Sequence, residues 1–377
     1  MVQRADPTAP ARTLARTPVL RLDRTVTIAV AAAVALGVSA CSSAGGSRSA
    51  NVSTPATSAP VASITTARPQ SATGPTGSQP APSGAGSSQA AGTSPSAGNP
   101  PAVPAGGAYL GAWINPAGPA GVGPAGELAQ LPAFEQATAS HPAIIGLYAG
   151  FQSPAPMAAL EAISAAGAIP LLAWSCAPVG AVSSGVYDST VRNYALSLKS
   201  LGHPIFLRWF WEMNLPTRSS SSCLGTDGAP GFVQAWIHIW SIFHEVGATN
   251  VAFVWCPGVG GTAPFTPFFP GTAYVDWIAA DGYDRHHLGA EGFATVFAAW
   301  YDTYASSSKP LMVAETGATA SDQSQYVGGL AQTLPSSFPA VKAVVYFDAD
   351  GPNGNWSLTP AGLAAFKMVA SAQYFSA

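Results

Sequence analysis

The chain has 377 residues, a formal net charge of −3 and only 9% charged residues. Its charges are unevenly distributed: residues 108–377 hold 16 acidic side chains against eight lysines and arginines, whereas residues 1–40 hold five arginines against two aspartates. An acidic region without a basic stripe argues against a nucleic-acid partner, because such binding depends on cations that neutralise phosphates.

The first 40 residues have the organisation of an export signal. Five arginines between Arg4 and Arg24 precede an apolar run from Val26 to Val38, and the small residues Ser39 and Ala40 follow it. A basic segment, a short apolar segment and a small-residue cleavage site are typical of a signal peptide. The run is shorter than the roughly 20 residues that a transmembrane helix needs.

The cleavage site is followed by Cys41, and the segment from Val38 to Cys41 resembles the bacterial lipobox. This resemblance implies that Cys41 is lipidated and becomes the mature N-terminus. An uncleaved membrane anchor is the alternative. In either case we expect the rest of the chain at the extracellular face of the cell membrane, in contact with the bilayer through its anchor only.

Residues 41–107 are predicted to be a disordered linker. Between residues 42 and 107 there is no aromatic or acidic residue, and Arg48 and Arg68 are the only charges. A segment of Ser, Thr, Ala, Gly and Pro buries too little apolar surface to offset the entropy of ordering. All ten tryptophans lie beyond this segment. We therefore expect one folded domain at residues 108–377, near the typical size of a (β/α)8 barrel.

Short apolar runs alternate with longer helix-like runs along this domain. Apolar runs of five or six residues are typical of strands covered on both faces. The predicted strands are 109–113, 144–148, 169–174, 205–210, 251–255, 275–280, 311–314 and 341–347. The predicted helices are 157–166, 189–201, 232–246, 293–305 and 323–334, whereas the Pro- and Gly-rich link at 114–142 indicates its helix poorly.

Eight such units indicate a single-domain α/β protein of the (β/α)8 TIM barrel type, since alternating strands and helices form parallel sheets with right-handed crossovers. An open doubly wound sheet is the alternative. It is disfavoured because no glycine-rich phosphate-binding loop follows the first strand.

Three cysteines, Cys176, Cys223 and Cys256, lie in the predicted domain. An exported protein meets an oxidising compartment, which favours one disulfide and leaves one thiol. Connectivity does not follow from the sequence, and a pair of buried thiols is the alternative. We expect the Cys176–Cys223 pairing.

Four of the predicted strands end in carboxylates: Glu212, Asp281, Glu315 and Asp348 follow the fourth, sixth, seventh and eighth. The active sites of (β/α)8 enzymes lie at these C-terminal strand ends. A glutamate pair facing one another suits glycosidic cleavage, in which one carboxyl protonates the leaving oxygen and the other acts on the anomeric carbon or on water. Asp281 and Asp348 are interpreted as structural acids.

Aromatic side chains near the same ends could stack on sugar rings, although each one alone also fits core packing. The residues assigned to this rim are Trp113, Trp174, Trp211, Trp255, Tyr283 and Tyr346.

Three segments at the fourth, sixth and seventh strands combine these acids with aromatic and polar neighbours. They are Arg208-x-x-x-Glu212-Met213-Asn214, Phe269-Pro-Gly-x-x-Tyr274-Val-Asp276-Trp277-Ile-x-x-Asp281-Gly-Tyr283, and Ala314-Glu315-x-Gly317. In this order they resemble glycoside hydrolase family 26, a family of retaining (β/α)8 enzymes best known for β-mannanases.

The resemblance implies roles for individual residues. Glu212, in the Glu-Met-Asn motif, corresponds to the acid/base and Glu315 to the nucleophile. Tyr283 and Trp255 correspond to aromatic residues of the family's site, and we expect Arg208, Trp211 and Asn214 to bind the substrate with them. Two positions differ: Trp211 stands where histidine usually precedes the acid/base, and Leu215 where glycine is common.

The sequence thus predicts a monomeric, retaining endo-glycosidase that acts on a β-linked polysaccharide, mannan first, without a cofactor. No metal is expected, because the acids and amides between Asp348 and Asn355 lack EF-hand spacing. Two alternatives remain open: a non-catalytic carbohydrate-binding lipoprotein in which Trp211 marks lost activity, and a structural lipoprotein without a ligand.

Overall fold

A computed structural model describes residues 98–376 except 120–122, 261, 286–291 and 352–353. The predicted signal peptide at 1–40, Cys41 and most of the predicted linker lie outside the described residues. Within the described part, no helix is both long and apolar enough to cross a membrane.

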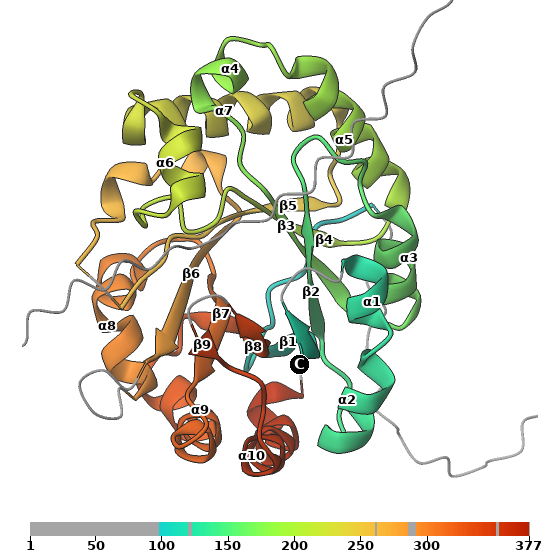
Figure 1. Ribbon diagram of the computed structural model, residues 1–377, viewed down its shortest axis with the longest axis vertical. Coiled ribbons are helices and arrows are strands. Elements are labelled where there is room, and N and C mark those ends of the chain that lie inside the picture. Colours follow the sequence, from blue (N-terminus) through green and yellow to red (C-terminus); the bar gives the residue numbers. More distant parts are fainter. Residues whose placement is uncertain (1–97, 120–122, 261, 286–291, 352–353, 377) are drawn as a thin grey trace, which may run out of the picture. The chain divides into compact units, whose positions relative to one another are not determined.

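Eight parallel strands follow one another in sequence order, and the first pairs with the last, so that the sheet closes into a barrel (Figure 1). This confirms the predicted (β/α)8 fold. The strands are β1 (Tyr109–Pro119), β2 (Ile144–Ala149), β3 (Ile169–Trp174), β4 (Ile205–Trp209), β5 (Val251–Trp255), β6 (Trp277–Asp284), β7 (Leu311–Ala318) and β8 (Val341–Gly351). A short strand, β9 (Gly354–Asn355), pairs antiparallel with the end of β8.

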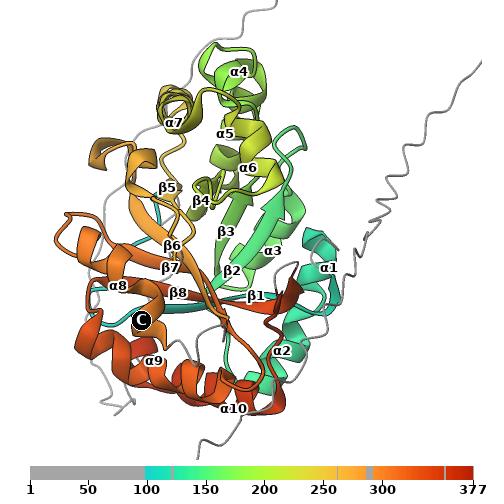
Figure 2. The ribbon, with the colours of Figure 1, turned by 60° about the vertical axis from the view of Figure 1, so that its left-hand side comes forward.

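Helices surround the barrel and cover its outer face (Figures 1 and 2). The five predicted helices are present within a few residues of their expected bounds. The α-helices are α1 (Pro124–Leu128), α2 (Leu131–Thr138), α3 (Met157–Ala165), α4 (Val179–Ser183), α5 (Asp188–Leu201), α6 (Arg218–Leu224), α7 (Gly228–Val246), α8 (Phe293–Tyr304), α9 (Gln323–Ser337) and α10 (Pro360–Ala370).

Four strands run at least four residues further than the apolar pattern indicated. β1, β6, β7 and β8 continue to Pro119, Asp284, Ala318 and Gly351. Strand register shifts between Ala280 and Asp281, and again between Val313 and Thr316. Such irregularities re-aim side chains at strand ends. As a result Tyr283 and Glu315 are held within paired strands and not in loops.

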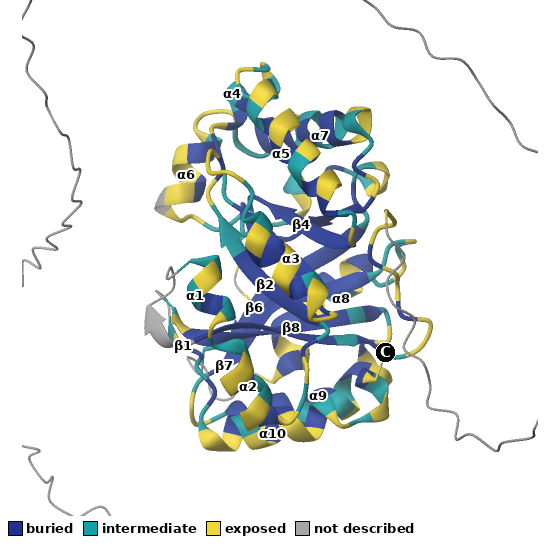
Figure 3. Ribbon diagram, turned by 90° about the vertical axis from the view of Figure 1, so that its right-hand side faces the viewer, coloured by how far each residue is buried: buried dark blue, intermediate teal, exposed yellow. Residues whose placement is uncertain are grey.

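The strands divide their side chains between two apolar layers, because successive residues point to opposite faces of a sheet. One layer fills the barrel and includes Leu171, Phe206, Val254 and Met312. The other packs under the helices, whose outer faces are exposed while the strands are buried (Figure 3). A shift of one residue therefore decides whether a strand-end side chain faces the barrel or the helices.

Cys176 and Cys223 form a disulfide that joins the segment after β3 to α6, which follows β4. Cys256 is a free, buried thiol at the end of β5. The covalent link connects two neighbouring loops at the end of the barrel where the strands terminate.

The chain contacts the barrel before Ala108. Gly98 donates its N–H to the carbonyl of Gly202 (2.7 Å) and accepts from Thr249 Oγ1 (2.8 Å). Pro101 and Pro104 are buried. Gly202 and Thr249 precede β4 and β5, so this segment lies at the end of the barrel where the strands begin. Residues 98–107, which the sequence assigned to the linker, thus contact the barrel, because proline-rich backbone can pack without regular structure.

Candidate active site

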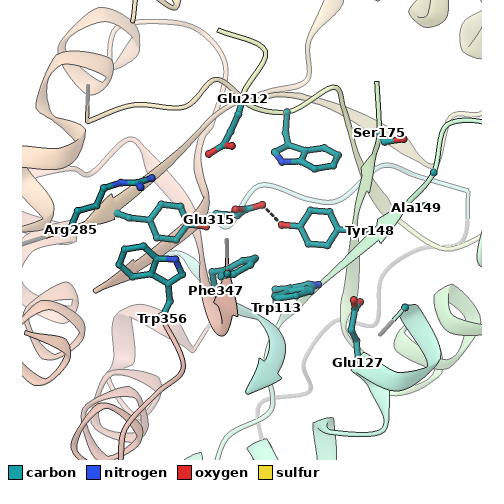
Figure 4. Close-up of a pocket in the computed structure, with 15 residues that line it drawn as sticks. Trp113, Glu127, Tyr148, Ala149, Ser175, Glu212, Arg285, Glu315, Phe347 and Trp356 are labelled. Atoms are coloured by element: carbon teal, nitrogen blue, oxygen red, sulfur yellow. Dashed lines mark hydrogen bonds between the residues drawn. The ribbon is translucent and has the colours of Figure 1, made fainter. Parts of the chain in front are cut away.

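A cavity of about 490 Å³ opens at the C-terminal ends of the strands (Figure 4). Its walls are largely aromatic and come from β1, β2, β6, β8 and the segments after β4 and β9. The aromatic residues are Trp113, Tyr148, Trp211, Tyr283, Phe347 and Trp356. The charged residues on its walls are Glu127, Glu212, Glu315 and Arg285. The described residues contain no group of three His, Cys, Asp or Glu side chains suited to a metal ion.

Glu315, on β7, is held by three donors from three other strands. Tyr148 and Arg208 donate to its Oε1, and Tyr283 donates to Oε2 at 2.6 Å. Burial raises the pKa of Tyr148 and of Tyr283 well above the ordinary value, so both phenols keep the protons that they donate. Glu315 is 5% exposed. Both of its carboxylate oxygens accept hydrogen bonds, which fix the orientation of the group.

Arg208 lies beneath Glu315 in a buried network. Its Nη1 donates to both carboxylate oxygens of Asp281 at 2.8 Å, and Cys256 Sγ donates to Asp281 Oδ1 at 3.1 Å. The guanidinium is almost fully buried and does not line the cavity. Arg208 therefore positions Glu315 from below and is not a wall of the cavity, which corrects its assignment as a substrate-binding residue.

Glu212 follows β4 in a turn with unusual backbone geometry. Phe210 and Glu212 have positive φ values of 48° and 52°, which are costly for residues with a side chain. Two backbone bonds impose this path: Phe210 N–H to Trp174 O (2.9 Å) and Glu212 N–H to Cys256 O (2.8 Å). The turn is thus fixed by the ends of β3 and β5, and it directs the Glu212 side chain into the cavity (Figure 4).

The Glu212 carboxyl has a different environment from that of Glu315. It accepts no hydrogen bond from any described side chain. Burial, and secondarily repulsion from Glu315, raise its pKa to about 7. One cavity therefore holds a carboxylate fixed by donors and a carboxyl that retains a proton near neutral pH.

Asn214 is a positioning residue. Its Nδ2 donates to Gly258 O and its Oδ1 accepts from Gly258 N–H, both at 2.9 Å. These bonds tie the turn after β4 to the loop after β5. Asn214 does not line the cavity, so its position does not support the predicted role in substrate binding. Trp211 does line the cavity, with its ring 5.1 Å from that of Tyr148 and 5.6 Å from the Arg208 guanidinium.

Three of the predicted rim aromatics face the helices and not the cavity. Trp174 stacks on Tyr194 with ring centroids 4.2 Å apart, and Trp255 donates its indole N–H to Phe268 O at 2.9 Å. Tyr346 donates to Trp356 O at 3.0 Å. All three are at most 1% exposed. They are one residue out of register with the inward-facing positions, so their assignment to a sugar-binding rim is wrong.

Five aromatic or charged wall residues were missed. Tyr148 and Phe347 alternate in phase with inward-facing residues of their strands, so strand periodicity could have identified them. Arg285 and Trp356 come directly after β6 and β9, beyond the strands that the apolar pattern indicated, and Arg285 lies within 6 Å of the Tyr283 and Trp356 ring centroids. Glu127 is on α1 in the Pro- and Gly-rich link, where no pattern marks it. It is 4% exposed, and burial raises its pKa to about 7.

No family model matches the chain. Among characterised proteins, the chain is 26% identical over 207 residues to Endoglucanase H of Acetivibrio thermocellus, which covers 49% of this chain and 22% of that protein. The chain therefore spans about a fifth of the length of that relative.

Solved structures with a similar fold include the YdhT protein of Bacillus subtilis (TM-score 0.51, 16% identity, 71% of this chain and 86% of that one). The catalytic domain of a family 26 endo-β-1,4-mannanase from Bacillus sp. JAMB-750 is also similar (0.52, 13%, 72% and 87%). A third is a β-mannanase from a symbiotic protist of the termite Reticulitermes speratus, complexed with gluco-manno-oligosaccharide (0.51, 16%, 75% and 96%). At these identities the likeness shows that the chain shares their barrel fold.

Proposed function

We propose that this chain is a retaining glycoside hydrolase in which Glu315 is the nucleophile and Glu212 is the acid/base. The observation that carries the proposal is the contrast between the two carboxyls of one cavity. Glu315 is fixed by three donors, whereas Glu212 accepts none from the described side chains and has a pKa of about 7. Glycosidic cleavage requires two carboxyl groups, one ionised and one that carries a proton, and different surroundings produce this difference.

In the first step, Glu315 attacks the anomeric carbon while Glu212 gives its proton to the leaving glycosidic oxygen. The bond between these two sugar atoms breaks, and a covalent ester joins the sugar to Glu315. The hydrogen bonds from Tyr148, Arg208 and Tyr283 hold the nucleophile at a fixed orientation, so little reorganisation precedes attack.

In the second step, Glu212 is an anion and removes a proton from water. That water attacks the anomeric carbon and displaces Glu315, which returns to its carboxylate form. Two displacements at the same carbon leave its configuration unchanged. A raised pKa suits both roles of Glu212, because the group must give and take one proton near neutral pH.

The proposed substrate is a β-linked polysaccharide, with mannan as the first candidate and cleavage within the chain as the mode of action. Aromatic walls support a sugar ligand, since ring faces pack on the apolar faces of pyranoses. Two of the similar folds named above are described as β-mannanases, and the curated relative is described as an endoglucanase.

The proposed location is the extracellular face of a bacterial membrane, with a lipid on Cys41 as the anchor. The N-terminal charge and hydropathy pattern supports this location. Replacing Cys41 by Ala should release the protein from the membrane fraction with its fold intact. Unchanged retention would mean that the apolar run from Val26 to Val38 is itself the anchor.

The function is tested by incubating the purified domain, residues 98–377, with β-mannans, β-glucans and xylans. We expect hydrolysis of at least one polymer, with the β anomer as the first product in proton NMR. The α anomer would refute the retaining mechanism. Binding without hydrolysis would instead favour the non-catalytic alternative, and Trp211→His would then be the first substitution to examine for recovered activity.

A further inference from the structure

Glu127 is a buried acid at the cavity that the proposed reaction does not use. It lies on α1, is 4% exposed and lines the cavity. Its Oε2 has no hydrogen-bond partner within the described part of the chain. A buried polar atom without a partner is costly, and the cost is removed when a ligand supplies the missing bond.

Trp113 offers a second polar atom without a partner beside Glu127. Its ring, on β1, lines the same cavity, and its Nε1 has no acceptor among the described residues. Stacking on Phe347 at 4.4 Å and an edge contact with Tyr148 at 5.2 Å hold the ring in place. Figure 4 shows the Glu127 carboxyl pointing toward the nitrogen end of this indole.

The two side chains are neighbours, because a hydrogen-bonding interaction from Trp113 offsets part of the rise in the pKa of Glu127. Neither Trp113 Nε1 nor Glu127 Oε2 has a partner in good hydrogen-bond geometry within the described residues. The pair therefore presents one donor and one acceptor, side by side, to whatever occupies that end of the cavity.

From this arrangement we propose that Trp113 Nε1 and Glu127 form a subsite that binds one free hydroxyl of a neutral sugar residue. This inference rests on the proposed glycosidase function. A hydroxyl is donor and acceptor at once, so it satisfies both atoms. Because the pKa of Glu127 is raised to about 7, its carboxyl can accept from or donate to a ligand near neutral pH, and a hydroxyl fits either protonation state.

The subsite is distinct from the pair of glutamates. In the view of Figure 4 the Trp113 ring lies between Glu315 and Glu127. Arg285, the described cation on the cavity wall, lies on the other side of the cavity in this view. The sugar residue bound by Glu127 therefore stacks on or beside Trp113, next to the residue that is cleaved.

The test compares kcat and KM of wild type, Glu127→Gln, Glu127→Ala, Trp113→Phe and the double variant Glu127→Ala/Trp113→Phe. The substrates are β-1,4-linked mannotetraose, cellotetraose and xylotetraose. The control is Glu135→Gln, because Glu135 is a partly exposed acid on α2 that pairs with His141 and does not line the cavity. Thermal unfolding is recorded for each variant, and the isosteric Glu127→Gln keeps the test valid should Glu127→Ala destabilise α1.

We expect Glu127→Ala to lower kcat/KM about 10- to 100-fold on the tetrasaccharide that wild type prefers, because the hydrogen bond between the sugar hydroxyl and the buried Glu127 carboxyl is lost. Trp113→Phe should lower it by a smaller factor, and the double variant by less than the product of the two factors. Glu127→Gln, which keeps an acceptor, should fall between wild type and Glu127→Ala. One monodeoxy analogue of that substrate lacks the hydroxyl that Glu127 binds. Wild type and Glu127→Ala should cleave that analogue with the same kcat/KM.

A change below twofold in both Glu127 variants, with wild type active, would overturn the subsite and leave the proposed function intact. If wild type cleaves neither a tetrasaccharide nor any of the three polymers, the proposed function fails, and calorimetric binding of the same three tetrasaccharides decides the subsite separately. Binding that weakens at least tenfold in Glu127→Ala would support it. Binding that is absent, or unchanged in the variant, would refute it.

Discussion

The surroundings of Glu315 and Glu212 differ although both residues face the same cavity. Glu315 is part of a regular strand and receives donors from β2, β4 and β6. Glu212 is part of a turn with left-handed backbone and receives none from the described side chains. The comparison teaches that barrel strands supply rigid, preorganised groups, whereas the turn after a strand can present a carboxyl to a less polar environment, where it keeps its proton.

Removing Glu315 should have the largest effect. If Glu315 is the nucleophile, no glycosyl-enzyme forms without it, so Glu315→Ala should lower kcat by about 10⁴- to 10⁶-fold on every substrate. Azide added to this variant should attack from the opposite face and give the α-glycosyl azide from a β-glycoside. The configuration is read by NMR. A β product would contradict the assigned role.

Removing Glu212 should have an effect that depends on the leaving group. Glu212→Ala should lower kcat/KM about 10²- to 10⁴-fold on oligosaccharides, which need protonation, and far less on activated aryl glycosides. Azide should now give the β product, since Glu315 still forms the intermediate. Equal losses on the two substrate types would refute an acid/base role.

Breaking the ion pairs beneath Glu315 should affect the fold. Arg208→Met leaves Asp281 buried without its cation, which should lower the free energy of unfolding by about 3–5 kcal/mol. Denaturant titration measures this change. The control is Arg192→Met, whose pair with Glu245 is exposed and should contribute about 0–1 kcal/mol. Similar values for the two variants would contradict the network's structural role.

The smallest expected effect concerns the pH dependence of stability. The pKa of Glu212 is raised from its ordinary 4.5 to about 7, so the folded state binds this proton more tightly than the unfolded state. The resulting stability is complete below pH 4.5 and is lost as the pH rises through 7. Glu212→Gln cannot ionise and should therefore be more stable than wild type at pH 8, by about 1–2 kcal/mol. A difference that is the same at pH 4 and pH 8 would contradict this reasoning.

The fold could be predicted because a closed barrel is one of the few arrangements that bury eight apolar runs of strand length. The positions of Glu212 and Glu315 at strand ends followed from the same pattern. The wall aromatics were partly wrong, since Trp174, Trp255 and Tyr346 are adjacent to inward-facing residues and only the strand phase separates the two faces. Glu127 could not be predicted, because its orientation depends on a five-residue helix within an irregular link.

The contacts of Gly98 with Gly202 and Thr249 have a consequence for how the proposed hydrolase would meet a polymer. Gly98 lies at the end of the barrel where the strands begin, and the cavity opens at the end where they finish. A polymer that reaches the cavity therefore approaches the barrel from the end opposite to Gly98, and the contacts of Gly98 do not narrow the cavity entrance.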